Sequence, residues 1–114
     1  MHELSIAMSL VQMADEAARK AEATQVTALY VRVGALSSVV PDALRFSFDL
    51  AAAGTLVEGA RLEIEELPVR VFCIHCGVES ELPSPQVFRC PICQRPTGQL
   101  VQGRELELTS LEVE

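Results

Sequence analysis

Two short motifs, Cys73-Ile-His-Cys76 and Cys90-Pro-Ile-Cys93, stand thirteen residues apart in the second half of this chain. Paired CxxC knuckles present four thiolates at the spacing of a tetrahedral structural zinc site. The segment between them has too few apolar residues to form a core alone, so a metal would supply much of its folding free energy. We therefore predict that all four cysteines bind one structural zinc ion.

Two other uses of these cysteines fit the sequence less well. A thioredoxin-like redox pair needs one CxxC that opens a helix within a βαβ unit, whereas here two knuckles are closely paired. A catalytic zinc keeps one position open for water, and four sulfur ligands leave none. His75 lies inside the first knuckle, either as a solvent-facing spacer or as a reserve ligand or pH-sensitive neighbour of the zinc.

Residues 4–22 carry apolar side chains at steps of three and four residues, which is typical of one face of an amphipathic helix. We expect this alanine-rich face to lie close against a sheet. Its predicted members are Leu4, Ala7, Met8, Val11, Ala14, Ala18 and Ala21.

Strands are predicted at residues 26–33 and 61–67, where strand-forming or alternating residues dominate, and again around residues 105–108. A second helix is expected to begin at Pro41, because proline is favourable at the first helical position. The order is helix, strand, helix, strand, cysteine module, strand. The module thus interrupts the sheet-forming sequence, and its two connections should lie side by side.

The charge and composition exclude several classes of partner. Nine basic residues against sixteen acidic ones give a net charge of −7, which argues against binding to phosphate backbones or anionic membranes. No apolar run approaches the roughly 20 residues that span a bilayer. The opening residues lack the basic segment of a signal peptide. We expect a cytoplasmic protein of one ordinary domain, or of one core plus a small metal-held module.

The N-terminus offers a second metal-binding group. The α-amino nitrogen, the backbone nitrogen of His2 and its imidazole can chelate one ion, and such planar, nitrogen-rich sites favour Ni(II) or Cu(II) over zinc or magnesium. His2 is bulky, so Met1 should be retained as the first residue. The alternative is that His2 is an incidental feature of a flexible terminus.

Taken as a whole, the chain resembles the HypA/HybF family, the nickel metallochaperones of [NiFe]-hydrogenase maturation. The resemblance covers essentially the whole chain. It rests on Met1-His2-Glu3-Leu4-Ser5, Val33-Gly34-Ala35-Leu36, Pro41, Leu44, Phe46-Ser47-Phe48, Thr55, Glu58-Gly59-Ala60, Leu62, Ile64, Pro68, Cys73, Cys76, Phe88, Cys90-Pro91, Cys93 and Gly103-Arg104-Glu105-Leu106.

This resemblance implies an α+β fold, in which two helices pack on a small antiparallel sheet and a zinc-ribbon-like domain is inserted. Residues 1–70 plus 103–114 would form the nickel-binding domain, and residues 71–102 the zinc-binding domain. The implied nickel ligands are Met1 through its amine and His2 through its imidazole, with Glu3 supplying backbone nitrogen or shaping the site. Cys73, Cys76, Cys90 and Cys93 correspond to the family's zinc ligands.

The resemblance also implies Ni(II) as cargo and Zn(II) as a structural ion. The implied partners are a nickel-handling GTPase and the hydrogenase large subunit, and some members also serve urease maturation. Whether the chain is a monomer or a homodimer is left open. One departure concerns the histidines that some relatives carry just after their knuckles, because Gly77 and Gln94 occupy those positions here.

Three other functions were weighed against nickel delivery. A zinc-stabilised adaptor could dock proteins on a strand face bearing Glu63, Glu65, Glu105 and Glu107, although a solvated strand face is the favoured interpretation of these residues. Nucleic-acid binding predicts a basic stripe with aromatic residues, and only 4% of this chain is aromatic. An enzyme is not expected, because the only two histidines stand far apart in the sequence.

Overall fold

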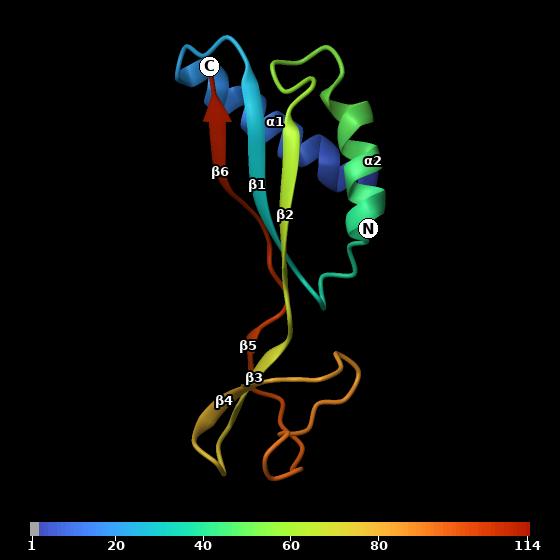
Figure 1. Ribbon diagram of the computed structural model, residues 1–114, viewed down its shortest axis with the longest axis vertical. Helices are drawn as coiled ribbons and strands as arrows, with labels where there is room; N and C mark the ends of the chain where they lie inside the picture. Colours follow the sequence, from blue (N-terminus) through green and yellow to red (C-terminus); the bar gives the residue numbers. More distant parts are fainter. Residues whose placement is uncertain (1–2) are drawn as a thin grey trace. The chain divides into compact units, whose positions relative to one another are not determined.

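The computed structural model describes residues 3–114 (Figure 1). Two helices and six strands follow one another in the order that the sequence predicts, with three strands belonging to the cysteine module. The elements are α1 (Glu3–Lys20), β1 (Val26–Gly34), α2 (Pro41–Ala52), β2 (Arg61–Leu67), β3 (Arg70–Cys73), β4 (Val78–Glu81), β5 (Leu100–Gln102) and β6 (Leu106–Val113).

Helix α1 buries a face that is rotated from the predicted one. Leu4 and Met8 were expected inside, yet 45% and 57% of their surface is exposed. Ile6 and Leu10 are buried instead, beside Ala7, Ala14 and Ala18, which were assigned correctly. Ala21 was also expected inside, but it lies past the end of α1 and is exposed. Small alanines at steps of three and four residues fit more than one helical phase, so the sequence period did not decide between neighbouring faces.

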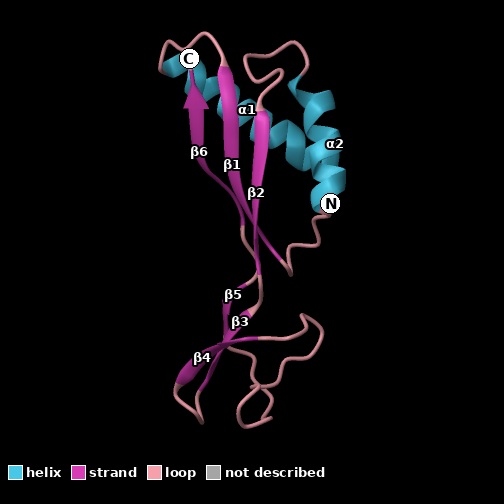
Figure 2. Cartoon of the chain, viewed as in Figure 1, coloured by secondary structure: helices cyan, strands magenta, loops and turns pink. Residues whose placement is uncertain are grey.

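The first sheet has the strand order β2-β1-β6, and α1 crosses behind its three strands (Figure 2). Leu29, Val31 and Val33 of the central strand are buried, as their alternation predicts. On the solvent side, Arg32 of β1 pairs with Glu65 of β2 at 3.3 Å and reaches Glu107 of β6 at 3.9 Å. These two glutamates therefore take part in cross-strand ion pairs.

Asp15 of α1 fixes the turn that follows α2. Its Oδ1 accepts a hydrogen bond from the Leu56 backbone N–H at 3.0 Å, and its Oδ2 pairs with Arg19 Nε at 2.9 Å. The Arg19 hydrogen bond first, and the Leu56 amide second, hold the pKa of Asp15 below its usual value of 3.8. The charged carboxylate thus stabilises the folded state above that value, and the contribution is lost as the pH falls through the lowered pKa.

Replacing Asp15 with Asn should lower the melting temperature by a few degrees at neutral pH, because the charge on both hydrogen bonds is lost. The difference from the wild type should shrink in acid, below the lowered pKa, where the wild-type carboxyl is also protonated. Thermal melts at both pH values measure this. Asp49→Asn, at an exposed site, is the matched control. An Asp15→Asn deficit of the same size at both pH values would contradict the assigned role of the charge.

The second sheet, of order β4-β3-β5, carries the cysteine module. Strands β3 and β4 form an antiparallel hairpin in which Cys73 stands opposite Val78, so the first knuckle is the turn of that hairpin. Pro68 separates β2 from β3, because proline has no N–H to donate to a strand ladder. The same region has a small buried core of Val69, Val71 and Leu82, and Leu36, Phe88 and Leu100 pack against this core.

Gly34 and Gly103 allow two backbone segments to approach unusually closely. A Cβ atom on Gly34 would stand 2.1 Å from the Gly103 carbonyl oxygen, inside any permitted contact distance. Backbone hydrogen bonds hold the crossing, from Gly34 N to Glu105 O and from Leu36 N to Gly103 O. The side chain of Glu105 accepts a further bond from Gly103 N. Gly34 thus does more than end β1, because its missing side chain makes this contact possible.

The chain divides into two compact units. Unit 1 comprises the chain up to Arg32, together with Val39–Glu65 and Glu107–Glu114, and unit 2 comprises Val33–Ser38 and Glu66–Leu106. The boundary proposed from the sequence, with residues 71–102 as a separate zinc-binding domain, stays a prediction. Between residues 3 and 114, neither helix combines the length and the apolar character needed to cross a membrane.

Candidate metal centre

The first knuckle is a tight turn that points its two cysteines to one side. Gly77 N donates to Cys73 O at 2.7 Å, and Gly77 adopts a φ of +72°, which suits glycine. Cys76 N donates to Cys73 Sγ at 3.4 Å, so the backbone of the turn also supports a sulfur. Gly77 therefore eases this turn.

The second knuckle repeats the same geometry with a different residue at the strained position. Gln94 N donates to Cys90 O at 2.8 Å, and Gln94 has a φ of +63°. Arg95 O then accepts a hydrogen bond from Cys90 N at 2.9 Å, which closes the turn. The sequence analysis did not predict this left-handed residue, although its position after the second cysteine matches that of Gly77. A non-glycine residue there costs roughly 1–2 kcal/mol.

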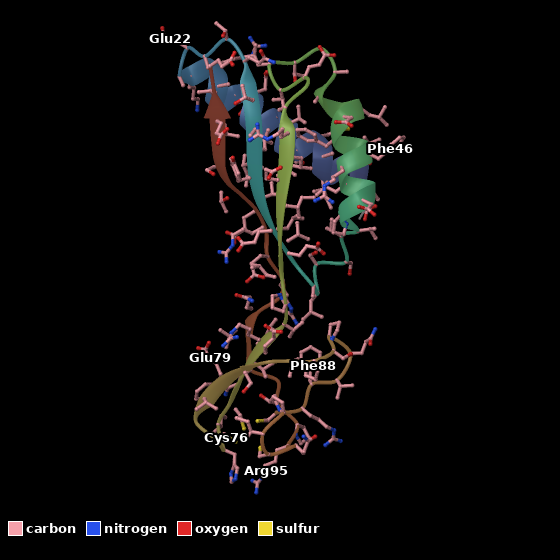
Figure 3. All side chains as sticks on the ribbon, viewed as in Figure 1. Glu22, Phe46, Cys76, Glu79, Phe88 and Arg95 are labelled. Carbon is pink, nitrogen blue, oxygen red and sulfur yellow. The ribbon has the colours of Figure 1, made fainter. Side chains whose placement is uncertain are left out.

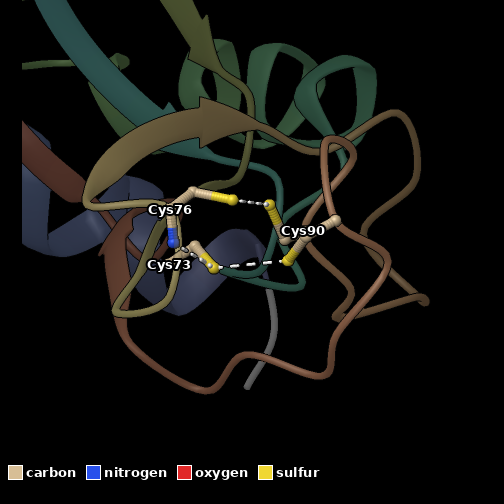
Figure 4. A group of neighbouring side chains, drawn as sticks. Cys73, Cys76 and Cys90 are labelled. Atoms are coloured by element: carbon tan, nitrogen blue, oxygen red, sulfur yellow. Dashed lines mark hydrogen bonds between the residues drawn. The ribbon is translucent and has the colours of Figure 1, made fainter.

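The two knuckles bring all four predicted cysteines into one cluster (Figure 4). Their sulfur atoms all lie within 4.8 Å of one another. Cys73 Sγ lies 3.6 Å from Cys93 Sγ, and Cys76 Sγ lies 3.9 Å from Cys90 Sγ. Tetrahedral zinc with Zn–S bonds of about 2.3 Å requires sulfur–sulfur distances of about 3.8 Å, so the donor set fits that ion. The four cysteines are free thiols rather than disulfides.

The crowded sulfurs have very different proton affinities. The neighbouring Cys93 thiol and burial raise the pKa of Cys76 to about 12. By contrast, the backbone amide of Cys93 lowers the pKa of Cys90 to about 7. Only thiolates bind metal tightly, so a cation entering this cluster would have to displace protons from it.

His75 lies outside the four-sulfur cluster. It lines a cavity of about 380 Å³ together with Ile74, Arg95 and Gln99. His75 itself is exposed, as the solvent-facing interpretation requires. Since the four sulfurs already form a closed tetrahedral set, a reserve-ligand role for this histidine has no structural support within the described residues.

The predicted nickel site falls mostly outside the described residues, because Met1 and His2 both precede them. Glu3, the third predicted residue, begins α1. Its Oε2 accepts a hydrogen bond from the backbone N–H of Val40 at 3.2 Å, and Val40 is the residue just before α2. Glu3 thus ties the start of α1 to the start of α2.

The acidic charge of the chain is concentrated in unit 1, which contains the first described residues. Unit 1 has twelve acidic and five basic residues, a net charge of −7, whereas unit 2 has four of each and is formally neutral. A strongly negative surface attracts cations and basic proteins over a distance of about one Debye length.

The two helices, the small sheets and the clustered cysteines define a small α+β protein with a zinc-ribbon-like insertion. The family described as "Hydrogenase/urease nickel incorporation, metallochaperone, hypA" has a model that matches residues 1–113. The chain therefore belongs to the HypA family. This is a family of metallochaperones and maturation factors rather than of enzymes, in agreement with the sequence prediction.

Individual relatives support the same assignment. The chain is 56% identical over 112 residues to hydrogenase maturation factor HypA of Chloroflexus aggregans, and the match covers 98% of each protein. It is 42% identical to the protein of the same description from Picosynechococcus sp., with 99% of each covered.

Solved structures confirm the fold. The solution structure of the Ni metallochaperone HypA from Helicobacter pylori matches with a TM-score of 0.67 at 26% identity, covering 99% of this chain and 97% of that one. A second solution structure of a HypA protein matches with a TM-score of 0.73 at 27% identity, covering 100% and 97%. The predicted fold class, with two helices and small antiparallel sheets, is thereby confirmed.

Proposed function

We propose that this chain binds Ni(II) at its N-terminus and delivers it for the maturation of [NiFe]-hydrogenase. The observation that carries this proposal is membership, over nearly the full length, of a family whose description is nickel incorporation. The chain's own residues supply a suitable chelate, since Met1 offers an amine and His2 offers a backbone nitrogen and an imidazole. Glu3 adds a backbone nitrogen or shapes the site.

The proposed chelate suits transport because a terminal segment can hold an ion and also release it. Nitrogen-rich planar donor sets favour Ni(II) and Cu(II), so nickel selectivity would depend on availability and delivery. The hydrogen bond from Val40 N to Glu3 fixes the root of this segment on two helices. The negative charge of unit 1 would further attract the cation.

The proposed role of Cys73, Cys76, Cys90 and Cys93 is to hold a structural Zn(II). Four sulfurs within 4.8 Å leave no open position for a substrate, which favours a structural ion over a catalytic one. The two metals would thus have separate tasks, with sulfur donors for structure and nitrogen donors for cargo.

The proposed setting is the cytoplasm, where a nickel-handling GTPase would assist delivery to the hydrogenase large subunit. An accessory protein of urease maturation is a further candidate, because the family description names urease as well. The acidic surface of unit 1 suits basic protein surfaces better than nucleic acid or anionic membranes.

A nickel titration of the zinc-loaded protein with its native Met1, beside the His2→Ala variant, tests the cargo site. We expect tight one-to-one binding by the wild type. For His2→Ala we expect a loss of affinity of about 100-fold, the upper end of what mutating even an outer-shell partner of a metal site costs. An N-terminal tag should have the same effect, because it removes the free amine. His75→Ala is the matched control and should bind nickel as the wild type does.

Undiminished binding by His2→Ala or by the tagged chain would refute the terminal chelate. If the wild type itself binds no nickel, family membership would stand for the fold, and a zinc-stabilised adaptor would become the better proposal. Isothermal titration calorimetry distinguishes these cases, since it gives both the stoichiometry and the affinity.

A further inference from the structure

The thiol–thiol contacts of the metal centre join the first knuckle to the second. Cys73 Sγ contacts Cys93 Sγ at 3.6 Å, and Cys76 Sγ contacts Cys90 Sγ at 3.9 Å. Figure 3 shows Cys76 on the hairpin turn of the module, with the sulfur atoms drawn in yellow, and Figure 4 draws the contacts as dashed lines. These two contacts thus run across the cluster rather than within a knuckle.

The cysteines also differ in their access to solvent. Cys73 and Cys90 are 4% and 0% exposed, whereas Cys76 and Cys93 are half-buried. Each contact across the cluster therefore combines an accessible sulfur with a buried one. A small oxidant reaches the two accessible sulfurs first, and each of them already has a buried thiol as its neighbour. The diagonal pairing of Cys73 with Cys90 would instead leave two buried thiols to react with each other.

A covalent bond across the cluster would hold the module together as a metal ion does. Cys73 and Cys93 stand 20 positions apart in the chain, and Cys76 and Cys90 stand 14 apart. Bonds that close such loops constrain the unfolded chain more than a bond inside one CxxC turn does. A bond inside a knuckle would also leave the two knuckles unconnected. Only the pairing across the cluster replaces the constraint that a metal ion supplies.

We propose that the four cysteines form a redox switch, in which a peroxide converts the zinc-loaded cluster into the disulfides Cys73–Cys93 and Cys76–Cys90 and releases the zinc ion. This inference rests on the proposed zinc site and is independent of the nickel site. Disulfides in a reducing compartment are usually transient or redox-sensing, which suits a reversible change of this kind. A thiol reductant together with zinc should restore the metal-loaded form.

The chemistry balances with one peroxide molecule for each disulfide. The accessible thiolate of a pair attacks a peroxide oxygen, the O–O bond breaks, and a sulfenic acid and a hydroxide ion are formed. The buried thiolate then attacks that sulfur, so the S–S bond forms and the S–O bond breaks to release a second hydroxide ion. Each pair thereby loses two electrons to the peroxide, and protons from solvent convert the hydroxide ions to water.

The first disulfide is sufficient to release the metal. A disulfide sulfur carries no negative charge, so only two thiolates remain where a structural zinc site requires four ligands. The second disulfide then forms between the two thiolates that remain. The module thus has two alternative cross-links, which are a metal ion in the reduced chain and a pair of covalent bonds in the oxidised chain.

Tryptic digestion and mass spectrometry test this pairing directly. Cleavage after Arg70, Arg89 and Arg104 places the first knuckle on one peptide and the second knuckle on another. The zinc-loaded chain is treated with hydrogen peroxide, blocked with an alkylating reagent and digested without reductant. We expect the two peptides to be joined in the major product, and a zinc-sensitive dye to detect one released ion per chain. Fragmentation between the two cysteines of each peptide should then assign the individual bonds.

Two controls separate the effect of the fold from the intrinsic reactivity of the thiols. The reduced, metal-free chain in concentrated urea should give mainly separate peptides, because a short CxxC loop closes at the lowest entropic cost in an unfolded chain. His75→Ala changes the first knuckle outside the sulfur cluster and should give the wild-type product. By amide hydrogen exchange, the oxidised chain should keep unit 2 protected, whereas chelator with a thiol reductant should remove that protection.

Separate peptides from the folded chain would overturn the inference, and so would joined peptides in which Cys73 is bonded to Cys90. Sulfinic acids in place of disulfides, or zinc that stays bound to the disulfide form, would overturn it as well. An untreated chain that holds no zinc would refute the proposed zinc site and this inference with it. The nickel titration with His2→Ala does not depend on any of these outcomes, so failure of this inference can be told apart from failure of nickel binding.

Discussion

Replacing Gly34 with alanine is expected to destabilise the protein by about 3 kcal/mol, the upper end of the usual cost of overpacking. The added methyl group would stand 2.1 Å from the Gly103 carbonyl oxygen and 2.7 Å from the Arg104 backbone nitrogen. Neither is the flexible end of a side chain, so the two backbone segments must separate. That movement would break the hydrogen bond from Leu36 N to Gly103 O, now 2.7 Å long.

The measurement is a thermal or urea melt of the zinc-loaded variant beside the wild type. We expect the melting temperature to fall on the order of 10 °C. Gly98→Ala is the matched control, because a Cβ at Gly98 would meet nothing within 4 Å. If both variants have the melting temperature of the wild type, the close approach of residues 34 and 103 does not exist in solution.

The sequence predicted those parts of the fold that local patterns determine. The strand at residues 61–67 and the helix beginning at Pro41 were found because alternation and a favourable first residue act over short distances. The grouping of the four cysteines followed from their spacing, since a CxxC turn brings its own two sulfurs together.

The parts that the sequence did not reveal depend on contacts between distant segments. Leu36 follows β1, yet it packs against Val69, Val71 and Leu82, which no short-range pattern connects to it. Likewise, no short-range pattern marks the close approach at Gly34, because its partner Gly103 lies 69 positions further along the chain.

The two predicted metal sites also differ in how far short-range sequence patterns determine their contacts. The four cysteines were predicted from the sequence to form one metal site, and their sulfurs are clustered as that prediction requires. The hydrogen bond of Glu3 could not be predicted from the sequence, because its carboxylate accepts it from the backbone N–H of Val40, 37 residues away. The resemblance implied that Glu3 supplies a backbone nitrogen or shapes the nickel site, and this role stays a prediction beside the observed contact.

The zinc cluster should be the principal source of stability for unit 2, so Cys90→Ala is expected to have the largest effect of any single substitution. The buried aliphatic core of this unit is small and consists of Val33, Leu67, Val69, Val71 and Leu82. Structural zinc in small peptides supplies about 10–16 kcal/mol, which exceeds what so small a core can replace. Losing one of four ligands should therefore unfold the unit.

We expect Cys90→Ala to lose its zinc and to expose unit 2 to proteolysis, while unit 1 keeps its own core of Leu29, Leu44 and Phe48. Zinc content by mass spectrometry and amide hydrogen exchange measure the two effects. His75→Ala, inside the other knuckle but outside the sulfur cluster, should retain one zinc ion per chain and normal protection. Adding a strong chelator to the wild type should reproduce the Cys90→Ala pattern, because either treatment removes the ion.

A Cys90→Ala variant with one zinc ion and an unchanged melting curve would contradict the four-cysteine site. A variant that loses zinc yet keeps full protection in unit 2 would have a different meaning, since the apolar core and the β4-β3-β5 sheet would then suffice for folding. The structure favours the first expectation for a physical reason. Sulfurs that stand 3.6 and 3.9 Å apart across the two knuckles would repel one another as thiolates unless a cation offset their charge.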